Sequence, residues 1–165
     1  MRSARSMEVG VMSNSAIFDT TLYQREIFFD DLEKGQTFPP YRYRLEPAYV
    51  QAYLKAVGED HPAFREERAA HAAGFEGVIV PPPAVLSYGF IYSAMKRRPP
   101  TGYLNTAVSF EFLAPVRAGA ELTLNLNVED KFIKRERKFI ILKAVVDDTT
   151  GHAVACARID CIFPA

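Results

Sequence analysis

A carboxylate and an imidazole stand side by side at Asp60 and His61, in the segment 58–64 that reads Gly-Glu-Asp-His-Pro-Ala-Phe. Both groups can take up and release protons, which is what general acid–base catalysis requires. Adjacent side chains of an extended loop point in opposite directions, so we expect His61 to point away from a cleft lined by Asp60. Each residue also has a structural interpretation, because an Asp two positions before Pro62 often serves turn formation and His61 can cap or orient the loop backbone.

A second group of candidates follows the three prolines at 81–83. Residues 84–95 are apolar nearly all round, with prolines before them and basic residues and two more prolines after them. This pattern predicts one long, buried helix. Ser87, one turn into that helix, could bind a ligand, although a helical serine more often bonds back to its own backbone. Tyr88 could line a ligand tunnel or belong to the core.

The segment 58–64 needs an element that places it at a cleft. Pro47 suits the first turn of a helix, and apolar residues recur at intervals of three and four from Tyr49 to Val57. Gly58 can adopt the left-handed conformation that ends a helix. Asp60 is therefore predicted to lie in a loop just past a helix over 47–57. A short helix is expected over 66–73, closed by Gly74.

The rest of the sequence predicts strands. Apolar and polar residues alternate over 104–112 and 122–129, while residues 139–146 are apolar on both faces, as in the middle of a sheet. A last strand carries Ala155 to Phe163. Its two cysteines, Cys156 and Cys161, are expected on opposite faces, which disfavours a disulfide. Without a CxxC motif or a nearby histidine cluster, no metal site is expected.

Composition restricts the possible partners. Twenty acidic and twenty basic residues cancel, which does not favour nucleic acid binding, and no apolar run approaches the ~20 residues needed to cross a bilayer. Residues 1–20 are expected to form a disordered leader and residues 21–165 a single domain. The absence of a secretory signal pattern and the two thiols favour a cytoplasmic location.

Basic residues cluster in the segment 131–138, predicted to be a hairpin tip. This cluster could bind the phosphate groups of a ligand or an acidic protein, or it could be an ordinary solvated tip. The candidate phosphate-binding residues there are Lys134 and Arg135. Arg97 and Arg98, after the predicted central helix, have the same two interpretations.

Three segments resemble the MaoC-like family of hotdog-fold dehydratases and hydratases. Residues 58–64 are similar to its Gly-Asp-x-Asn-Pro-x-His segment, residues 110–119 to its Phe-x-x-Pro-Val-x-x-Gly segment, and residues 72–82 to the Ala-Pro-Pro type of its N-terminal-half branch. The resemblance implies an α+β fold with a single hotdog domain, in which an antiparallel sheet wraps around a long central helix. It also implies a dimer, since hotdog domains usually pair their sheets edge to edge.

The resemblance further implies addition of water to an enoyl thioester, or the reverse dehydration. Asp60 keeps the family's carboxylate, but Phe64 stands where the family has its catalytic His, and Pro81-Pro82 replaces a His-Gly pair; His61 is the possible substitute. The implied substrate-binding residues are Phe64, Pro82, Pro83, Ala84, Ser87 and Tyr88. No cofactor is implied beyond the coenzyme A or carrier protein of the thioester. The basic residues named above could bind the phosphates of that coenzyme A or the acidic carrier protein: Arg97, Arg98, Lys134 and Arg135.

Two functions remain open at this stage. The first is an enoyl-CoA hydratase or 3-hydroxyacyl dehydratase acting on an acyl-CoA or a carrier-bound acyl chain. The second is a non-catalytic acyl-binding subunit that completes the site of a separate hotdog partner, as the N-terminal-half branch often does. A thioesterase shares the fold, but the segment 58–64 fits hydratases better.

Overall fold

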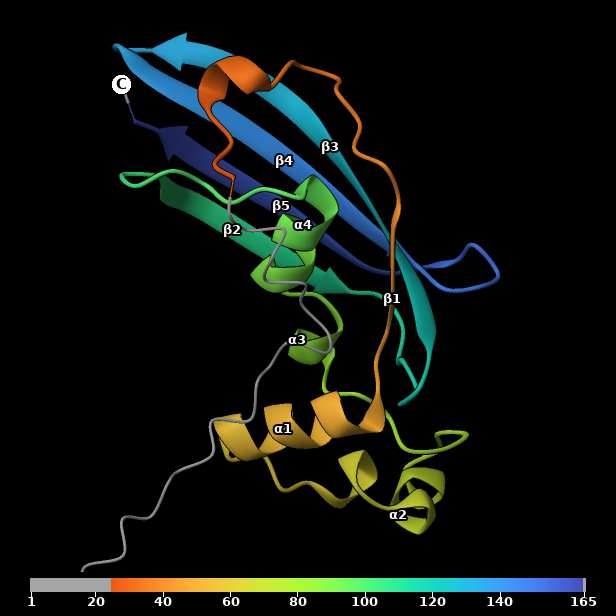
Figure 1. The fold of residues 1–165 in the computed structure, drawn as a ribbon. Coiled ribbons are helices and arrows are strands. Elements are labelled where there is room, and N and C mark those ends of the chain that lie inside the picture. Colours follow the sequence, from red (N-terminus) through yellow and green to blue (C-terminus); the bar gives the residue numbers. More distant parts are fainter. Residues whose placement is uncertain (1–24, 165) are drawn as a thin grey trace, which may run out of the picture.

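Residues 25–164 are described by a computed structural model, in which five antiparallel strands form one sheet in the order β1-β3-β4-β5-β2 (Figure 1). The strands are β1 (Tyr41–Arg44), β2 (Leu104–Phe112), β3 (Glu121–Lys134), β4 (Arg137–Asp147) and β5 (Ala153–Phe163). The curved sheet encloses α4 (Tyr88–Met95), while α1 (Pro47–Val57) and α2 (Glu67–Ala72) lie beyond one end of it. This arrangement is the predicted hotdog-type α+β fold.

The doubly apolar segment 139–146 lies in β4, the middle strand of the sheet, as predicted. Alternating residues of β3, β4 and β5 point toward α4 and are fully buried; they include Leu124, Ile140 and Ile159. Phe90 of α4 is also fully buried. The side chains on this face of the sheet thus pack with α4 into one core.

The helices next to the candidate loop are where the sequence predicts them. In α1 the apolar positions Val50 and Leu54 are buried, and Gly58 follows with φ 68°, the left-handed cap. The predicted helix over 66–73 is α2, followed by Gly74 at φ 87°. These two helices bracket the segment that contains Asp60.

The long helix expected over 84–95 is wrong: it is broken into α3 (Pro82–Val85) and α4, with Leu86 and Ser87 extended between them. The carbonyl oxygens at the end of α3 bond to tyrosine hydroxyls instead of helical N–H groups. Tyr43 donates to the Val85 oxygen at 2.7 Å and Tyr49 donates to the Ala84 oxygen at 3.0 Å. These bonds satisfy carbonyls that a helix end leaves without partners, which permits the break.

Ser87 is therefore not inside a helix, and its predicted bond to its own helix backbone is also wrong. It is the N-cap residue of α4 with extended backbone angles. The back-bonding expected of a helical serine occurs instead at Ser93, whose hydroxyl donates to the Gly89 oxygen at 2.9 Å.

The basic segment 131–138 is mostly strand rather than hairpin tip, which corrects the expectation. β3 continues to Lys134 and β4 begins at Arg137, so the turn consists of Arg135 and Glu136. The Lys131 ammonium group lies over the Phe29 ring and donates to a backbone oxygen. The leader expected over residues 1–20 lies outside the described residues.

Both turn residues, Arg135 and Glu136, have positive φ, 50° and 63°. Two-residue hairpins of this geometry favour Asn-Gly, and left-handed backbone costs other residues about 1–2 kcal/mol each. The double change Arg135→Asn and Glu136→Gly is therefore expected to raise the free energy of unfolding by about 1 kcal/mol. Urea unfolding followed by circular dichroism measures this, with Lys134→Gln, outside the left-handed turn, as the control. A midpoint equal to that of the control would contradict the expectation.

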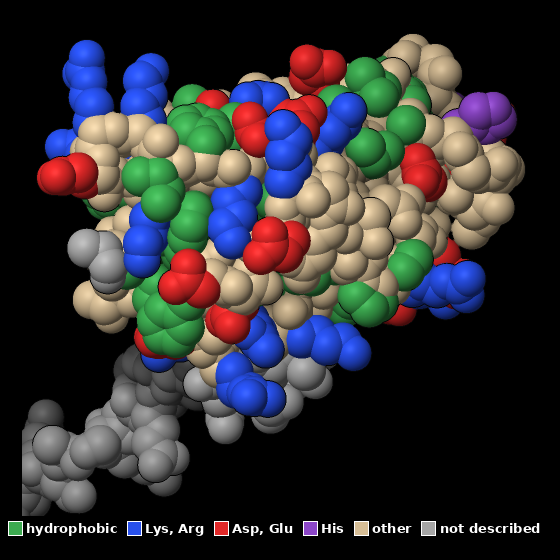
Figure 2. Space-filling view, turned by 90° about the horizontal axis from the view of Figure 1, so that it is seen from above, with side chains coloured by type: hydrophobic (Ala, Val, Ile, Leu, Met, Phe, Trp, Pro, Cys, Tyr) green, Lys and Arg blue, Asp and Glu red, His purple; other side chains and the backbone are tan. Residues whose placement is uncertain are grey.

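The face in Figure 2 carries acidic and basic side chains interspersed among hydrophobic ones, rather than a field of one sign. The described residues also form ion pairs between the two signs, among them Lys34–Asp130 and Arg158–Glu129. Within residues 25–164 no helix has the length and apolar character needed to cross a bilayer.

Candidate functional site

The segment after α1 is held by its own backbone and side chains. The Glu59 carboxylate accepts from the His61 N–H at 2.9 Å, and the His61 Nδ1 accepts from the Ala63 N–H at 3.2 Å. His61 thus caps η4 (Pro62–Phe64), a structural role considered from the sequence. The Arg65 guanidinium donates to the backbone carbonyl oxygen of Glu59 at 2.6 Å and closes the loop.

Asp60 is exposed to solvent in this loop. Among residues 25–164 its carboxylate has no hydrogen-bond or ion-pair partner, in contrast to Glu59 beside it. The loop is therefore fixed by groups other than Asp60. Its carboxylate remains available to bind a ligand or to accept a proton.

Phe64 packs half-buried against the core, with its ring 5.6 Å from the His61 ring. The Ile79 N–H donates to the Ala63 oxygen at 3.4 Å, which joins η4 to the segment leading into the prolines. The structure thus brings Phe64 and His61 together and connects their loop to the start of α3. A phenyl ring at this position offers apolar contact and no proton.

The other predicted substrate-binding residues differ in accessibility. Pro82 and Pro83 are exposed at the start of α3, while Ala84 is fully buried and presents only its carbonyl, to Tyr49. Ser87 and Tyr88 are half-buried at the start of α4. The Tyr88 ring meets Phe110 of β2 edge-on, with 6.1 Å between centroids.

Two tyrosines that the sequence reasoning missed organise the α3–α4 break. Tyr43 and Tyr49 come from β1 and α1, donate to carbonyl oxygens of α3 and pack against Phe90 at 4.0 and 5.9 Å between ring centroids. Desolvation raises the pKa of Tyr49 to about 12, and a hydrogen bond with the Ser87 side chain opposes the rise. In the sequence, Tyr49 belongs to the apolar pattern that predicts the helix over 47–57. Nothing in that pattern indicated its hydrogen bond to α3.

The buried thiol has no evident reactivity. Cys161 is fully buried on the core face of β5, and Cys156 is half-exposed on the opposite face, as predicted; both are free. Desolvation raises the pKa of Cys161 to about 11, so at neutral pH it is a thiol rather than a nucleophilic thiolate. The described residues also contain no cluster of three metal-binding side chains.

The four candidate phosphate-binding residues are not brought together with the loop. Arg97 pairs with Asp31 at 3.0 Å and Arg98 with Glu26 at 2.9 Å, so both already have acidic partners. Lys134 and Arg135 are exposed at the β3–β4 turn. That turn lies at the other end of the sheet from α1 and α2 (Figure 1).

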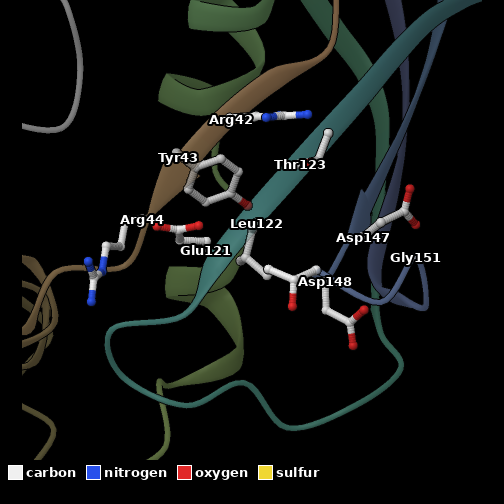
Figure 3. A pocket seen from close by; sticks show the side chains of 10 residues that line it. Arg42, Tyr43, Arg44, Glu121, Leu122, Thr123, Asp147, Asp148 and Gly151 are labelled. Atoms are coloured by element: carbon white, nitrogen blue, oxygen red, sulfur yellow. The ribbon is translucent and has the colours of Figure 1, made fainter.

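A cavity of about 690 Å³ also lies apart from the predicted site residues (Figure 3). Its walls are β1, the start of β3 and the β4–β5 connection, and they mix Arg42 and Arg44 with Asp147 and Asp148. None of the candidate residues lines it. Its mixed charges do not match an apolar acyl chain.

A smaller cavity of about 300 Å³ adjoins the candidate loop, between α1 and the segment before α3. Arg65 and Arg117 line it together with Glu67. The Arg117 guanidinium occupies the space next to Gly77, where any Cβ would come within 2.8 Å of it. Both arginines were missed from the sequence, since neither belongs to a basic cluster.

An antiparallel sheet in the order β1-β3-β4-β5-β2 around a helix defines the chain as a hotdog-fold protein. Solved structures agree on the fold. R-hydratase PhaJ1 from Pseudomonas aeruginosa matches with a TM-score of 0.69 at 21% identity, over 84% of this chain and 86% of that one. The HadBC (3R-hydroxyacyl-ACP dehydratase) complex from Mycobacterium tuberculosis matches with a TM-score of 0.64 at 20% identity, over 78% of this chain and 96% of that one.

The family follows from the sequence comparison. The profile of the FAS1-like, dehydratase domain region family matches residues 33–157. A UPF0336 protein of Streptomyces griseus is 31% identical over 130 residues, which cover 74% of this chain and 87% of the relative. The chain therefore belongs to the FAS1-like dehydratase domain family, and the predicted MaoC-like relationship is confirmed.

Proposed function

We propose that this protein binds acyl thioesters and adds water to an enoyl thioester, or removes it from a 3-hydroxyacyl thioester. The observation that carries the proposal is the unpartnered Asp60 carboxylate, exposed on a loop whose other polar groups are bonded. Membership in a dehydratase family supports the reaction class. The natural substrates are acyl chains on coenzyme A or on a carrier protein.

Asp60 is the proposed base. It would take a proton from a water molecule as the water oxygen forms its bond to C3 of the enoyl group, and the proton would then be delivered to C2. With Phe64 in place of the family's His, no second proton-transferring group is expected at that position. Turnover is therefore expected to be slow for a member of this family.

For coenzyme A, we propose Arg65 and Arg117 as better phosphate contacts than the four residues chosen from the sequence. Both arginines line the cavity that adjoins the loop. Arg97 and Arg98 are paired with carboxylates, and Lys134 and Arg135 lie at the other end of the sheet. Their assignment as coenzyme A phosphate contacts stays a prediction from the sequence.

Replacing Asp60 with Asn is expected to lower kcat for enoyl-CoA hydration at least about 100-fold, since general acid–base groups contribute about 100- to 10,000-fold. The assay follows conversion of enoyl-CoA esters of several chain lengths by the purified protein. Glu59→Gln is the matched control, because the neighbouring amide can still accept from the His61 N–H and should leave kcat within about twofold. Equal rates for wild type and Asp60→Asn would remove Asp60 from the mechanism.

A second function, an acyl-binding subunit of a larger hotdog assembly, is favoured by two observations. Phe64 supplies no proton, and the edge of the sheet formed by β2 is apolar and exposed. Strand β2 has no neighbour on its outer side among the described residues, and there Leu104 and Val108 are 61% and 39% exposed. HadBC and the ChsH1-ChsH2 complex of Mycobacterium tuberculosis are complexes with this fold.

We propose that β2 pairs with the same edge of a second hotdog domain. Sedimentation of the purified chain distinguishes the two functions when it is combined with the hydration assay. An active homodimer supports the enzyme, whereas a protein that binds acyl-CoA without turning it over supports the subunit and directs attention to a partner with an intact Asp and His.

A further inference from the structure

The glycine at position 77 provides space for an arginine rather than an unusual backbone conformation. Gly58 and Gly74 have positive φ, but Gly77 does not, so other residues could adopt its backbone angles. A Cβ at Gly77 would nevertheless lie 2.8 Å from Nη2 of Arg117, 3.1 Å from its Nε and 3.2 Å from its Cζ. The Arg117 guanidinium therefore lies directly on the Gly77 backbone, in space that any side chain at position 77 would take.

The backbone holds the two residues next to each other. Ile79 and Arg117 are partners in an isolated antiparallel bridge, and backbone hydrogen bonds of 2.7 and 2.9 Å join the segments 78–80 and 116–118 on either side of it. Among residues 25–164 the Arg117 guanidinium has no hydrogen-bond or ion-pair partner. Its position is thus fixed by packing on Gly77, and its N–H groups are left for a ligand.

The cavity of about 300 Å³ beside the candidate loop is lined by this guanidinium together with that of Arg65. Arg65 donates to a backbone oxygen rather than to a carboxylate. The lining carboxylate, Glu67, lies 3.7 Å from the Nε2 atom of His71 on its own helix. Two guanidinium groups therefore face the cavity without a carboxylate bound to either, and the planar fork of a guanidinium matches the oxygens of a phosphate.

The charges around the loop do not suit an acidic carrier protein. The segment 55–80, which includes the loop and α2, holds more carboxylates (Glu59, Asp60, Glu66, Glu67 and Glu76) than basic side chains (Lys55, Arg65 and Arg68). A carrier protein docks over a wide surface and would meet this excess of like charge. The phosphates of coenzyme A need only the cavity, where the basic groups are in excess.

We propose that Gly77 is a positioning residue that holds the Arg117 guanidinium at this cavity for a phosphate of the substrate. The site thereby selects acyl chains on coenzyme A over acyl chains on a carrier protein. This inference rests on the proposed function and names the carrier that the proposed function leaves open. Gly77 acts through Arg117 and does not touch the substrate itself.

The test compares the affinities of butyryl-CoA and butyryl-pantetheine, the same thioester without phosphates, by isothermal titration calorimetry. Wild type is expected to bind butyryl-CoA at least about tenfold more tightly, the effect of one hydrogen bond to a charged group. Gly77→Ala and Arg117→Gln should each lower this ratio about tenfold, with butyryl-pantetheine affinity within about twofold of wild type. Gly77→Ala should still fold, because the atoms it displaces are the flexible end of a side chain.

Two further variants and a third ligand complete the comparison. Arg68→Gln, at an exposed arginine of α2 outside the cavity, is the matched control and should keep the wild-type ratio. Adding Gly77→Ala to Arg117→Gln should cause no further loss, because the two residues act as one unit. A purely structural role of Gly77 would instead weaken both thioesters, with or without Arg117. A butyryl carrier protein is expected to bind wild type more weakly than butyryl-CoA does.

Several results would overturn the inference while leaving acyl-thioester binding intact. They are a ratio near one in wild type, an unchanged ratio in Gly77→Ala or Arg117→Gln, a lowered ratio in Arg68→Gln, a further loss in the double variant, and tighter binding of the carrier protein than of butyryl-CoA. Failure of wild type to bind any of the three thioesters would instead refute the proposed function, and the inference with it.

Discussion

Replacing Phe64 with His is expected to raise kcat for enoyl-CoA hydration by about 100-fold, the lower range for an added general acid–base group. The residue occupies the position at which the MaoC-like segment carries its catalytic His, and its side chain already lies on the loop that presents Asp60. An imidazole there could work together with the carboxylate on one water molecule. The gain is expected under both proposed functions, since an acyl-binding subunit would acquire the missing group.

The pH profile identifies the origin of any gain. A histidine acts as a base only when it is neutral, so the added activity should be lost as pH falls through about 6.5. Phe64→Gln is the control of similar polarity without a titratable proton, and it should show no gain. Activity of Phe64→His no higher than that of Phe64→Gln at pH 8 would mean that residue 64 does not face the reacting atoms.

Replacing Phe90 with Ala is expected to lower the free energy of unfolding by about 4 kcal/mol, within the range measured for buried phenylalanines. Phe90 is fully buried in α4, and its ring contacts both Tyr43 and Tyr49. The substitution removes the ring that packs against the two tyrosines bonded to α3, and it leaves a cavity between α4 and the sheet.

Phe28→Ala is the matched control for this measurement, since Phe28 is 50% exposed and should cost about 1 kcal/mol or less. Because the sequence contains no tryptophan, urea unfolding is best followed by circular dichroism. A loss in Phe90→Ala no greater than that in Phe28→Ala would contradict the described packing of α4.

The helices and strands could be predicted where local chemistry decides them. Pro47 and Gly58 delimit α1, and Gly74 follows α2, because proline suits a first turn and glycine adopts positive φ at little cost. The apolar segment 139–146 indicated the central strand because a strand in the middle of a sheet can be buried on both faces.

The break between α3 and α4 could not be predicted, because it depends on groups distant in sequence. Tyr43 and Tyr49 lie about 40 residues before the carbonyl oxygens that they bind (sequence separations of 42 and 35). Local pattern therefore predicted one helix, and the tertiary hydrogen bonds determined two. The role of Ser87 changed for the same reason.

The candidate site was predicted in part. The loop position of Asp60 follows from the helix before it, and the capping role of His61 is one of the two interpretations that the sequence allows. Arg65 and Arg117 could not be found from sequence, because their shared cavity forms only when the segment around Gly77 packs beside α1. Residue type indicated the chemistry of the loop, and packing determined which other side chains accompany it.

The most direct test of the proposed function is incubation of the purified chain alone with an enoyl-CoA in ¹⁸O-labelled water, followed by mass spectrometry of the acyl product. We predict a 3-hydroxyacyl-CoA that carries the label in its hydroxyl group, formed by wild type and not by Asp60→Asn. Label found only in a released carboxylic acid would show a thioesterase instead. Unchanged enoyl-CoA after prolonged incubation would contradict catalysis by this chain and leave acyl binding for a partner as its function.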